Sequence, residues 1–327
     1  MPRLILGQCF DISLGKPYLR AVPVSAYRNF TATVSAVEPL TPHFTRITFQ
    51  GEELAAFGDA GLDQRIKIIF PRTPGDDFAG FPDGDDWYAR WRELPADDRH
   101  AFRTYTPRAI RRDSGEVDVI FALHGDGGPA SRWAATATVG ERCVLVGPNA
   151  ESPDADVVGL EFKPGRAGEF LIVGDETALP AIWSICEALP TDATGSVLLE
   201  VPTSEDILPI EVPTGVELHW LPRNGRAHGE RVLSAAVTAG SGGSVGAETA
   251  SVTAAADSGS DLPSGDPAPT DGPLWHTDTV ADSDRFAWVA GESSMVVGVR
   301  RALVNQHGWS KKSIAFMGYW RHGRSEN

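Results

Sequence analysis

The segment FLIVGDETALPAIWSICEAL, residues 170–189, decides the fold class of the second half of the chain. It opens with a short apolar run ending at Gly174, which is typical of a buried strand. Beyond Ala178 the apolar residues recur at helical spacing, at Ile182, Ile185, Cys186 and Leu189. A strand that turns directly into a helix is the start of a crossover unit, so the segment predicts a parallel sheet with helices packed against it.

The same alternation of predicted strands and helices continues toward the C-terminus. Further strands are predicted at residues 197–201, 216–221, 286–290 and 313–318. A helix that runs through His307 is expected after the third of these strands. Together the elements predict a parallel-sheet α/β domain over residues 165–327.

Residues from about 238 to 284 interrupt this domain with Gly, Ser, Ala, Thr, Asp and Pro, and almost no large apolar side chain precedes Leu274. Such a segment cannot offset the entropy lost on ordering, so we predict a disordered insertion. It is acidic, because residues 236–284 hold eight Asp or Glu and neither Lys nor Arg. A tolerated surface insertion is the favoured interpretation, and a tethering segment is the alternative.

The first half of the chain reads differently. After an N-terminal extension of residues 1–26, apolar residues alternate with Thr and Arg in short segments broken by Pro and Gly. This pattern predicts an antiparallel β-barrel or sandwich over residues 27–150. Strands are expected at residues 66–70, 117–123 and 143–146. Residues 76–99, rich in Asp, Gly, Pro and Trp, are interpreted as a long surface excursion.

Composition excludes several classes of protein. A formal charge of −15 over 327 residues argues against binding to nucleic acid or anionic membranes. The three cysteines, Cys9, Cys143 and Cys186, lie too far apart for a thiolate metal site and are expected to be free thiols. No apolar run reaches the length of a signal peptide core or a membrane span. We therefore expect a soluble cytoplasmic protein without a resident metal. A monomer is the expected state, although composition does not determine it.

Two motifs of the first half combine residues suited to a phosphate-bearing aromatic ligand. In the run R-T-Y-T-P-R, Arg103 suits a phosphate and Tyr105 offers a flat stacking surface on the same strand face. The run H-G-D-G-G-P-A-S-R-W, residues 124–133, follows a strand directly. Its glycines permit close backbone approach, and Pro129 suits the first turn of a helix whose N-terminus attracts anions. Each motif alone is more typical of an ordinary strand edge or a capped turn than of a ligand site. Their separation of some twenty residues favours a ligand site, because a dinucleotide needs a flavin platform and a diphosphate turn together.

A third motif is the turn at residues 173–182, where the strand ends and the helix opens. It is not a G-x-G-x-x-G loop. Glu176 and Thr177 are expected to cap the helix. The spacing alone is as consistent with a capped turn as with a cofactor site.

Taken in order, five motifs resemble the siderophore-interacting, ferric-siderophore reductase family. They are R-x-Y-T-x-R, H-G-x-x-G-P-A-S-x-W, G-D-E-T-A-L-P-A-I, A-G-E at residues 290–292 and Y-W-R-x-G at residues 319–323. The resemblance implies a ferredoxin-reductase-like architecture, with an FAD-binding β-barrel followed by an NAD(P)H-binding α/β domain. It spans residues 27–323 apart from the insertion.

The resemblance also implies roles for individual residues. The expected flavin contacts are Arg103, Tyr105 and Thr106, with His124, Gly125, Gly128, Ala130 and Ser131 in the diphosphate turn. Asp175, Glu176, Thr177 and Ala178 fall at the nicotinamide-domain signature. Lys67, Arg132 and Arg321 would form a basic surface for an anionic ferric chelate. Glu200 and Arg223 end strands where a ribose or 2'-phosphate is read, or else form a surface pair.

The function implied is reduction of ferric siderophores through FAD, with NAD(P)H or ferredoxin as the electron donor. No catalytic acid, base or nucleophile is expected, because the flavin carries the chemistry. Two rivals remain open from the sequence. One is a general flavin or ferredoxin-type reductase of the same fold, and the other is a siderophore-binding protein without turnover.

Overall fold

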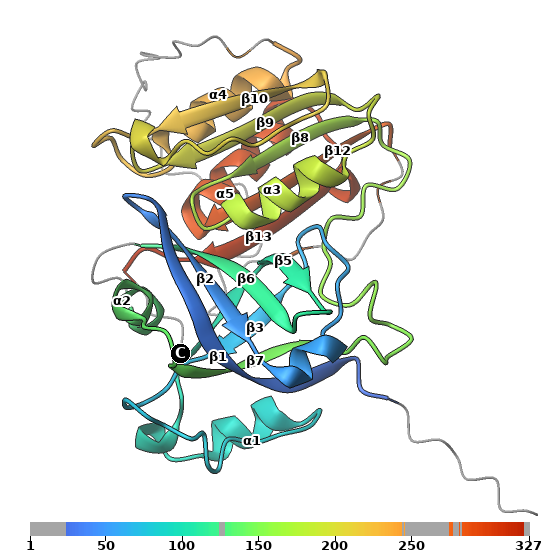
Figure 1. Ribbon diagram of the computed structural model, residues 1–327. Helices are drawn as coiled ribbons and strands as arrows, with labels where there is room; N and C mark the ends of the chain where they lie inside the picture. Colours follow the sequence, from blue (N-terminus) through green and yellow to red (C-terminus); the bar gives the residue numbers. More distant parts are fainter. Residues whose placement is uncertain are drawn as a thin grey trace, which may run out of the picture.

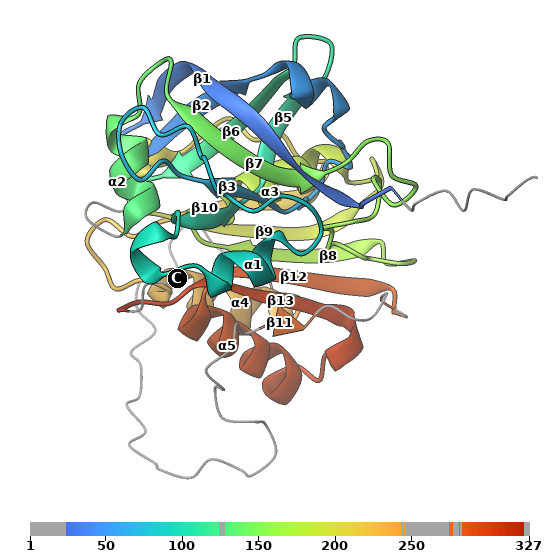
Figure 2. The ribbon, with the colours of Figure 1, turned by 90° about the horizontal axis from the view of Figure 1, so that it is seen from below.

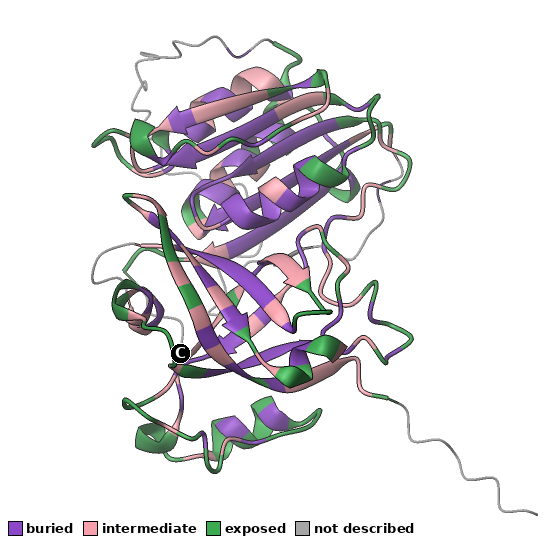
Figure 3. Cartoon of the chain, viewed as in Figure 1, coloured by how far each residue is buried: buried purple, intermediate pink, exposed green. Residues whose placement is uncertain are grey.

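A computed structural model describes residues 24–123, 128–243, 245, 275–276, 281 and 283–323. Figure 1 shows two layers of strands, with an antiparallel sheet below and a helix-covered sheet above. Both sheets are largely buried, whereas most exposed residues lie in the loops and on outer helix faces (Figure 3). The arrangement confirms the predicted order of an antiparallel β domain followed by an α/β domain.

The first sheet is a seven-stranded antiparallel half-barrel with the order β4-β3-β7-β1-β2-β6-β5. Its strands are β1 (Tyr27–Thr41), β2 (Phe44–Gln50), β3 (Ile66–Ile69), β4 (Phe102–Tyr105), β5 (Pro107–Arg111), β6 (Glu116–Ala122) and β7 (Arg142–Pro148). Alternate residues face one interior cluster that includes Phe30, Phe49 and Phe121. Helix α2 (Pro129–Thr136) closes this interior with Ala130, Ala134 and Trp133. The antiparallel pattern of period two therefore buries one face of each strand.

The excursion at residues 76–99 is more structured than the sequence suggested. It contains helix α1 (Trp87–Glu93) and the short turn η2 (Ala96–Asp98), while another short turn, η1 (Glu52–Ala56), follows β2. Phe78, Trp87 and Trp91 pack against Ile69, Val144 and Val146 on the outer face of the half-barrel. The aromatic residues of the excursion thus cover sheet surface that would otherwise be exposed to water.

The second sheet has the order β10-β9-β8-β12-β13-β11, and all of its pairings are parallel except that of β11 with β13. Its strands are β8 (Glu169–Gly174), β9 (Thr194–Val201), β10 (Gly215–Pro222), β11 (Trp275–His276), β12 (Arg285–Glu292) and β13 (Ile314–Trp320). The helices are α3 (Leu179–Ala188), α4 (Glu230–Gly240) and α5 (Ser293–Arg301), which continues into the π-helical turn η4 (Ala302–Gln306). Two further short turns are η3 (Ser204–Asp206) and η5 (Lys311–Ser313).

Successive residues of each parallel strand serve opposite faces of this sheet. Ile172 packs in the cluster that contains α3, while Val173 packs in the cluster that contains α4 and α5. Figure 2 shows the sheet between these helices from a second direction. Strands buried on both faces explain the continuous apolar runs in the sequence.

The predicted insertion is narrower than residues 238–284. Helix α4 extends to Gly240, where the buried Trp309 donates from Nε1 to the backbone carbonyl of Gly240. Val245 and Ala281 are buried in the two apolar clusters of the α/β domain, so both edges of the segment belong to the folded domain. The residues between these edges lie outside the described ranges, except for β11.

Polar contacts join the two sheets. The buried Asp63 carboxylate accepts from the indole Nε1 of Trp288 at 2.9 Å. At the tip of the β1–β2 hairpin, Thr41 Oγ1 and His43 Nδ1 lie 2.7 and 2.8 Å from the Asp206 carboxylate. Barrel residue Phe44 also packs in the α3 cluster, so the α/β domain and the half-barrel share an apolar core.

Two sequence expectations concern the rest of the chain. Cys143 and Cys186 are free and buried, as predicted, while Cys9 lies outside the described residues. None of the helices in the described ranges combines the length and apolar character needed to cross a lipid bilayer.

Candidate functional site

The first part of the site lies on the inner face of β4. Arg103 pairs with Ile68 and Tyr105 pairs with Ile66, so both side chains share the face of these two core residues. The Tyr105 ring packs on Phe121 with the centroids 4.5 Å apart, and burial raises the pKa of its phenol. A half-buried, neutral ring beside a guanidinium is the stacking surface that the sequence motif predicts.

The N-terminus of α2 faces Arg103. Gly128 precedes the helix with φ of +143°, and a Cβ at this position would lie 4.0 Å from Arg103 Nη2. The bare backbone, the guanidinium and the first turn of α2 therefore border one space. Such a donor set fits an anionic diphosphate, because a helix N-terminus and an arginine both favour negative charge.

Other predicted flavin contacts lie around this space. Thr106 is buried directly after β4, Ala130 is buried in the first turn of α2, and Ser131 is half-buried beside it. His124 and Gly125 lie outside the described residues. The structure thus brings Arg103 and Gly128 together on one side of β4.

The three residues of the predicted basic surface lie on three different parts of the fold. Lys67 pairs with Thr104 and therefore points to the face opposite Arg103 and Tyr105. Its Nζ donates to Thr104 Oγ1 at 3.2 Å and lies 5.1 Å from the Phe102 ring centroid. Arg132 and Arg321 are exposed on α2 and after β13.

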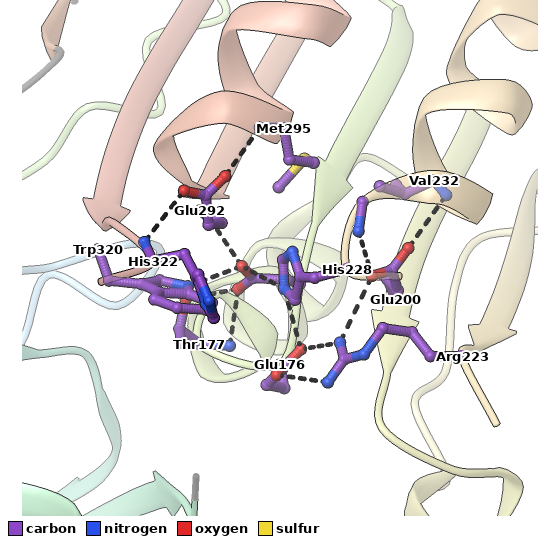
Figure 4. A network of polar contacts seen from close by, with 12 residues as sticks. Glu176, Thr177, Glu200, Arg223, His228, Val232, Glu292, Met295, Trp320 and His322 are labelled. Carbon is purple, nitrogen blue, oxygen red and sulfur yellow. Dashed lines mark hydrogen bonds and ion pairs between the residues drawn. The ribbon is translucent and has the colours of Figure 1, made fainter. Parts of the chain in front are cut away.

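The second part of the site is a buried polar network at the carboxyl edge of the parallel sheet (Figure 4). Asp175, directly after β8, is fully buried. Its Oδ1 accepts from the backbone N–H of Thr177 at 2.9 Å. Its Oδ2 accepts from the backbone N–H of Glu292 at 2.7 Å and from Trp320 Nε1 at 2.9 Å. Asp175 therefore ties together the ends of β8, β12 and β13.

This network corrects the predicted cap of α3. Neither Glu176 nor Thr177 caps the helix with its side chain, and the N-cap residue is Ala178. Asp175 instead accepts from both the N–H and the hydroxyl of Thr177. Glu176 instead pairs with the guanidinium of Arg223, which lies far from it in the sequence.

Glu176, Arg223 and Glu200 form a buried ion cluster. The Arg223 guanidinium binds Glu176 through both terminal nitrogens, with Nη1–Oε2 at 2.6 Å and Nη2–Oε1 at 2.8 Å. Arg223 Nη1 also lies 3.4 Å from Glu200 Oε1. Glu200 accepts from the backbone N–H groups of Gly229 and Val232 at 2.7 and 3.2 Å, so it also caps α4. The surface-pair interpretation of Glu200 and Arg223 is therefore wrong.

His228 is a member of the network that sequence reasoning missed. Its Nε2 lies 3.3 Å from Asp175 Oδ2 and 3.6 Å from Glu176 Oε2. Burial alone would lower the pKa of His228, but the two carboxylates raise it to about 10. The imidazole meets the Trp320 ring edge-on, with centroids 5.1 Å apart. The two carboxylates therefore favour the charged form of the imidazole.

Glu292 completes the edge as the N-cap of α5. Its Oε2 accepts from the N–H groups of Ser294 and Met295, and its Oε1 accepts from the N–H of His322. Burial alone would raise the pKa of Glu292, but these hydrogen bonds hold it below its usual range. The A-G-E turn thus lies beside Asp175 at the same edge of the sheet. There the carboxylates of Asp175, Glu176 and Glu200 surround the side chains of Arg223 and His228.

Comparisons with known proteins agree with this architecture. The family model described as the siderophore-interacting FAD-binding domain matches residues 33–152, and that described as siderophore-interacting protein matches residues 167–323. The chain belongs to the siderophore-interacting protein family. The half-barrel is therefore an FAD-binding domain, and FAD is the cofactor of this family member.

Three relatives extend the comparison. Ferric vibriobactin reductase ViuB of Vibrio cholerae serotype O1 is 28% identical over 287 residues, which cover 88% of this chain and 87% of ViuB. The siderophore-interacting protein SipS of Aeromonas hydrophila is 28% identical with a TM-score of 0.63, covering 92% of this chain and 94% of SipS. The ferredoxin reductase of carbazole 1,9a-dioxygenase is 16% identical with a TM-score of 0.54, covering 91% of this chain and 71% of the reductase, and shows the fold alone.

Proposed function

We propose that this flavoprotein reduces ferric siderophores to release Fe(II), using electrons from NAD(P)H or a reduced ferredoxin. The observation that carries the proposal is that Arg103 and Tyr105 share one face of β4, with the Arg103 guanidinium beside Gly128. This arrangement lies within the siderophore-interacting FAD-binding domain. The flavin-dependent activity is that of an oxidoreductase, and we propose that the protein acts as a cytoplasmic monomer.

The residues of the chain would bind and orient the flavin. Arg103 and the N-terminus of α2 would neutralise the diphosphate, while Tyr105 would stack on the ring system. Bound FAD supplies the conversion of a two-electron donation into single-electron transfers. Asp175, Glu176, Thr177 and Ala178 line the carboxyl edge of the parallel sheet, which is where open sheets of this class take a nucleotide.

Ferric iron is the substrate rather than a resident metal. Hard oxygen ligands hold Fe(III) tightly and hold Fe(II) far less well, so reduction releases the iron. Arg132 and Arg321, which are exposed, and Lys67 on the outer face of β3 would attract an anionic chelate against the overall acidity of the chain.

The proposal is tested by anaerobic mixing of the reduced, FAD-loaded protein with a panel of ferric siderophores. Flavin reoxidation and trapping of Fe(II) are followed together. We expect Arg321→Gln to raise the apparent KM for an anionic ferric chelate several-fold and to weaken its salt dependence. The matched control is Arg301→Gln, an exposed arginine of α5.

The same experiment discriminates the rival functions. A general flavin reductase would reoxidise equally fast with free flavin and without a preference among chelates. A binding protein without turnover would retain ferric chelates but stay colourless on purification. Equal kinetics of Arg321→Gln and wild type at every salt concentration would contradict the proposed basic surface.

A further inference from the structure

Arg223 lies at the edge of the parallel sheet where dinucleotide-binding folds take their ligand. It follows β10 at the carboxyl edge of the parallel sheet, beside Glu200 at the end of β9. In dinucleotide-binding folds, an arginine near this edge accommodates the 2'-phosphate of NADPH, whereas an acidic residue there suits NADH. The side chains that bind Arg223 therefore affect whether NADH or NADPH can serve as the electron donor.

We propose that Glu176 is a specificity-determining residue that holds Arg223 away from a 2'-phosphate, so that the crevice accepts NADH in preference to NADPH. This inference rests on the proposed function with NAD(P)H as the electron donor, and it specifies which of the two dinucleotides is preferred.

The contacts of Arg223 support this assignment. Both of its terminal nitrogens bind Glu176, at 2.6 and 2.8 Å, and the Arg223 side chain is only 14% exposed. Glu176 is 1% exposed, and Glu200 is fully buried. A two-pronged arginine–carboxylate pair of this kind is among the strongest polar contacts in proteins. If Arg223 turned toward a phosphate, the buried Glu176 carboxylate would lose both hydrogen bonds from the guanidinium, which is strongly unfavourable.

The charge of the surrounding edge acts in the same direction. Within this network the carboxylates of Asp175, Glu176 and Glu200 face two cations, Arg223 and His228. A 2'-phosphate would add nearly two further negative charges to this cluster, and like charges at short range repel. A 2'-hydroxyl adds none.

Selection here works by exclusion rather than by recognition of the 2'-hydroxyl. Both oxygens of Glu200 already accept backbone N–H groups, from Gly229 and Val232. The Asp175 carboxylate likewise accepts the Thr177 N–H at the turn before α3. Both dinucleotides therefore meet an edge whose carboxylate acceptors already have internal partners. The 2'-phosphate adds a penalty that only NADPH carries.

The test measures binding of two small probes to the FAD-loaded protein by calorimetry. The probe 2',5'-ADP carries the 2'-phosphate, and 5'-AMP lacks it. In the wild type we expect 5'-AMP to bind at least as tightly as 2',5'-ADP. Glu176→Gln should tighten 2',5'-ADP by about tenfold or more, the size of one charge-assisted phosphate contact, and change 5'-AMP by less than about threefold.

Two variants provide the controls. Glu230→Gln removes the same charge from the exposed start of α4, where Glu230 pairs with Arg226, and should leave the ratio of the two affinities unchanged. The double variant Glu176→Gln, Arg223→Gln should lose the gain in 2',5'-ADP affinity, because the freed cation is gone. The ratio of flavin reduction rates with NADH and NADPH should follow the affinities.

Several results would overturn the inference: a wild-type preference for 2',5'-ADP, an unchanged ratio in Glu176→Gln, an equal change in Glu230→Gln, or no binding of either probe. Failure of the proposed function is distinguished by a separate measurement. In that case photoreduced flavin is not reoxidised by any ferric chelate, a reaction that involves no nicotinamide.

Discussion

The raised pKa of His228 leads to an expected dependence of stability on pH. The imidazole lies between Asp175 and Glu176, which raise its pKa to about 10 in the folded protein. In the unfolded chain a histidine titrates near 6.5. A group whose pKa is raised by folding contributes its full stabilisation below the unfolded value. The contribution is lost as the pH rises from about 6.5 to about 10.

The magnitude follows from the two pKa values. At about 1.4 kcal/mol per pH unit, the difference sets an upper limit of about 5 kcal/mol on the free energy of unfolding. The side chain is 20% exposed, and its site also holds the Arg223 cation. Water and this second cation weaken the attraction, so we expect about 2 kcal/mol or somewhat more.

The perturbation is His228→Gln, which removes the charge and keeps a side chain that can donate a hydrogen bond. Urea unfolding is measured for wild type and variant at intervals from pH 6 to pH 10. The variant should be less stable at pH 6, and the two curves should converge toward pH 10. Buried thiols and phenols also reduce stability at high pH, but they do so equally in both proteins.

His219→Gln is the matched control, because His219 pairs with the exposed Glu217 carboxylate on β10. Its curve should run parallel to that of the wild type. A constant difference between His228→Gln and wild type across the whole pH range would refute the reasoning, since it would show that the imidazole stabilises the fold without its charge.

Three further predictions concern other parts of the molecule. Arg103→Ala should weaken FAD retention about tenfold or more, measured as flavin released on dilution, and unchanged occupancy would place the flavin elsewhere. Gly291→Ala should lower the free energy of unfolding by about 3 kcal/mol or more, because φ is +140° and a Cβ would lie 2.6 Å from Asp175 Cγ; Gly308→Ala, with φ of +64° and no atom near its Cβ, is the control for backbone strain alone. Deleting residues 247–272 should leave Tm and FAD binding nearly unchanged, and a large fall in Tm would show that the segment contributes to the core.

Periodicity explains why so much of the fold could be predicted. Alternation of period two assigned the half-barrel, and continuous apolar runs assigned β8 and β12, because a strand covered on both faces has no polar side. The start of α2 was also predictable, since Pro129 occupies its first turn and acts through local geometry. These signals depend only on residues close together in the sequence.

The predicted basic surface shows what the local sequence pattern cannot predict, namely the face of the sheet on which a side chain lies. The sequence places Lys67 one strand away from the flavin motif, but the register of β3 with β4 decides which face it occupies. A shift of one residue would have turned it toward Arg103. Such a register is set by the packing of the whole sheet.

By itself, then, the sequence determined the two-domain order, the sheet types, the family motifs and the acidic composition. Each of these depends on composition or on residues that are close together in the sequence. Only the tertiary structure decided the roles of Asp175, Glu176 and His228. Their partners, Glu292, Trp320 and Arg223, come from strand ends far along the chain. Local rules favour Glu176 as a helix cap, but a buried arginine gives it a stronger interaction. Parallel strands bring their carboxyl ends to one edge, and charges that gather there pair across it rather than along the chain.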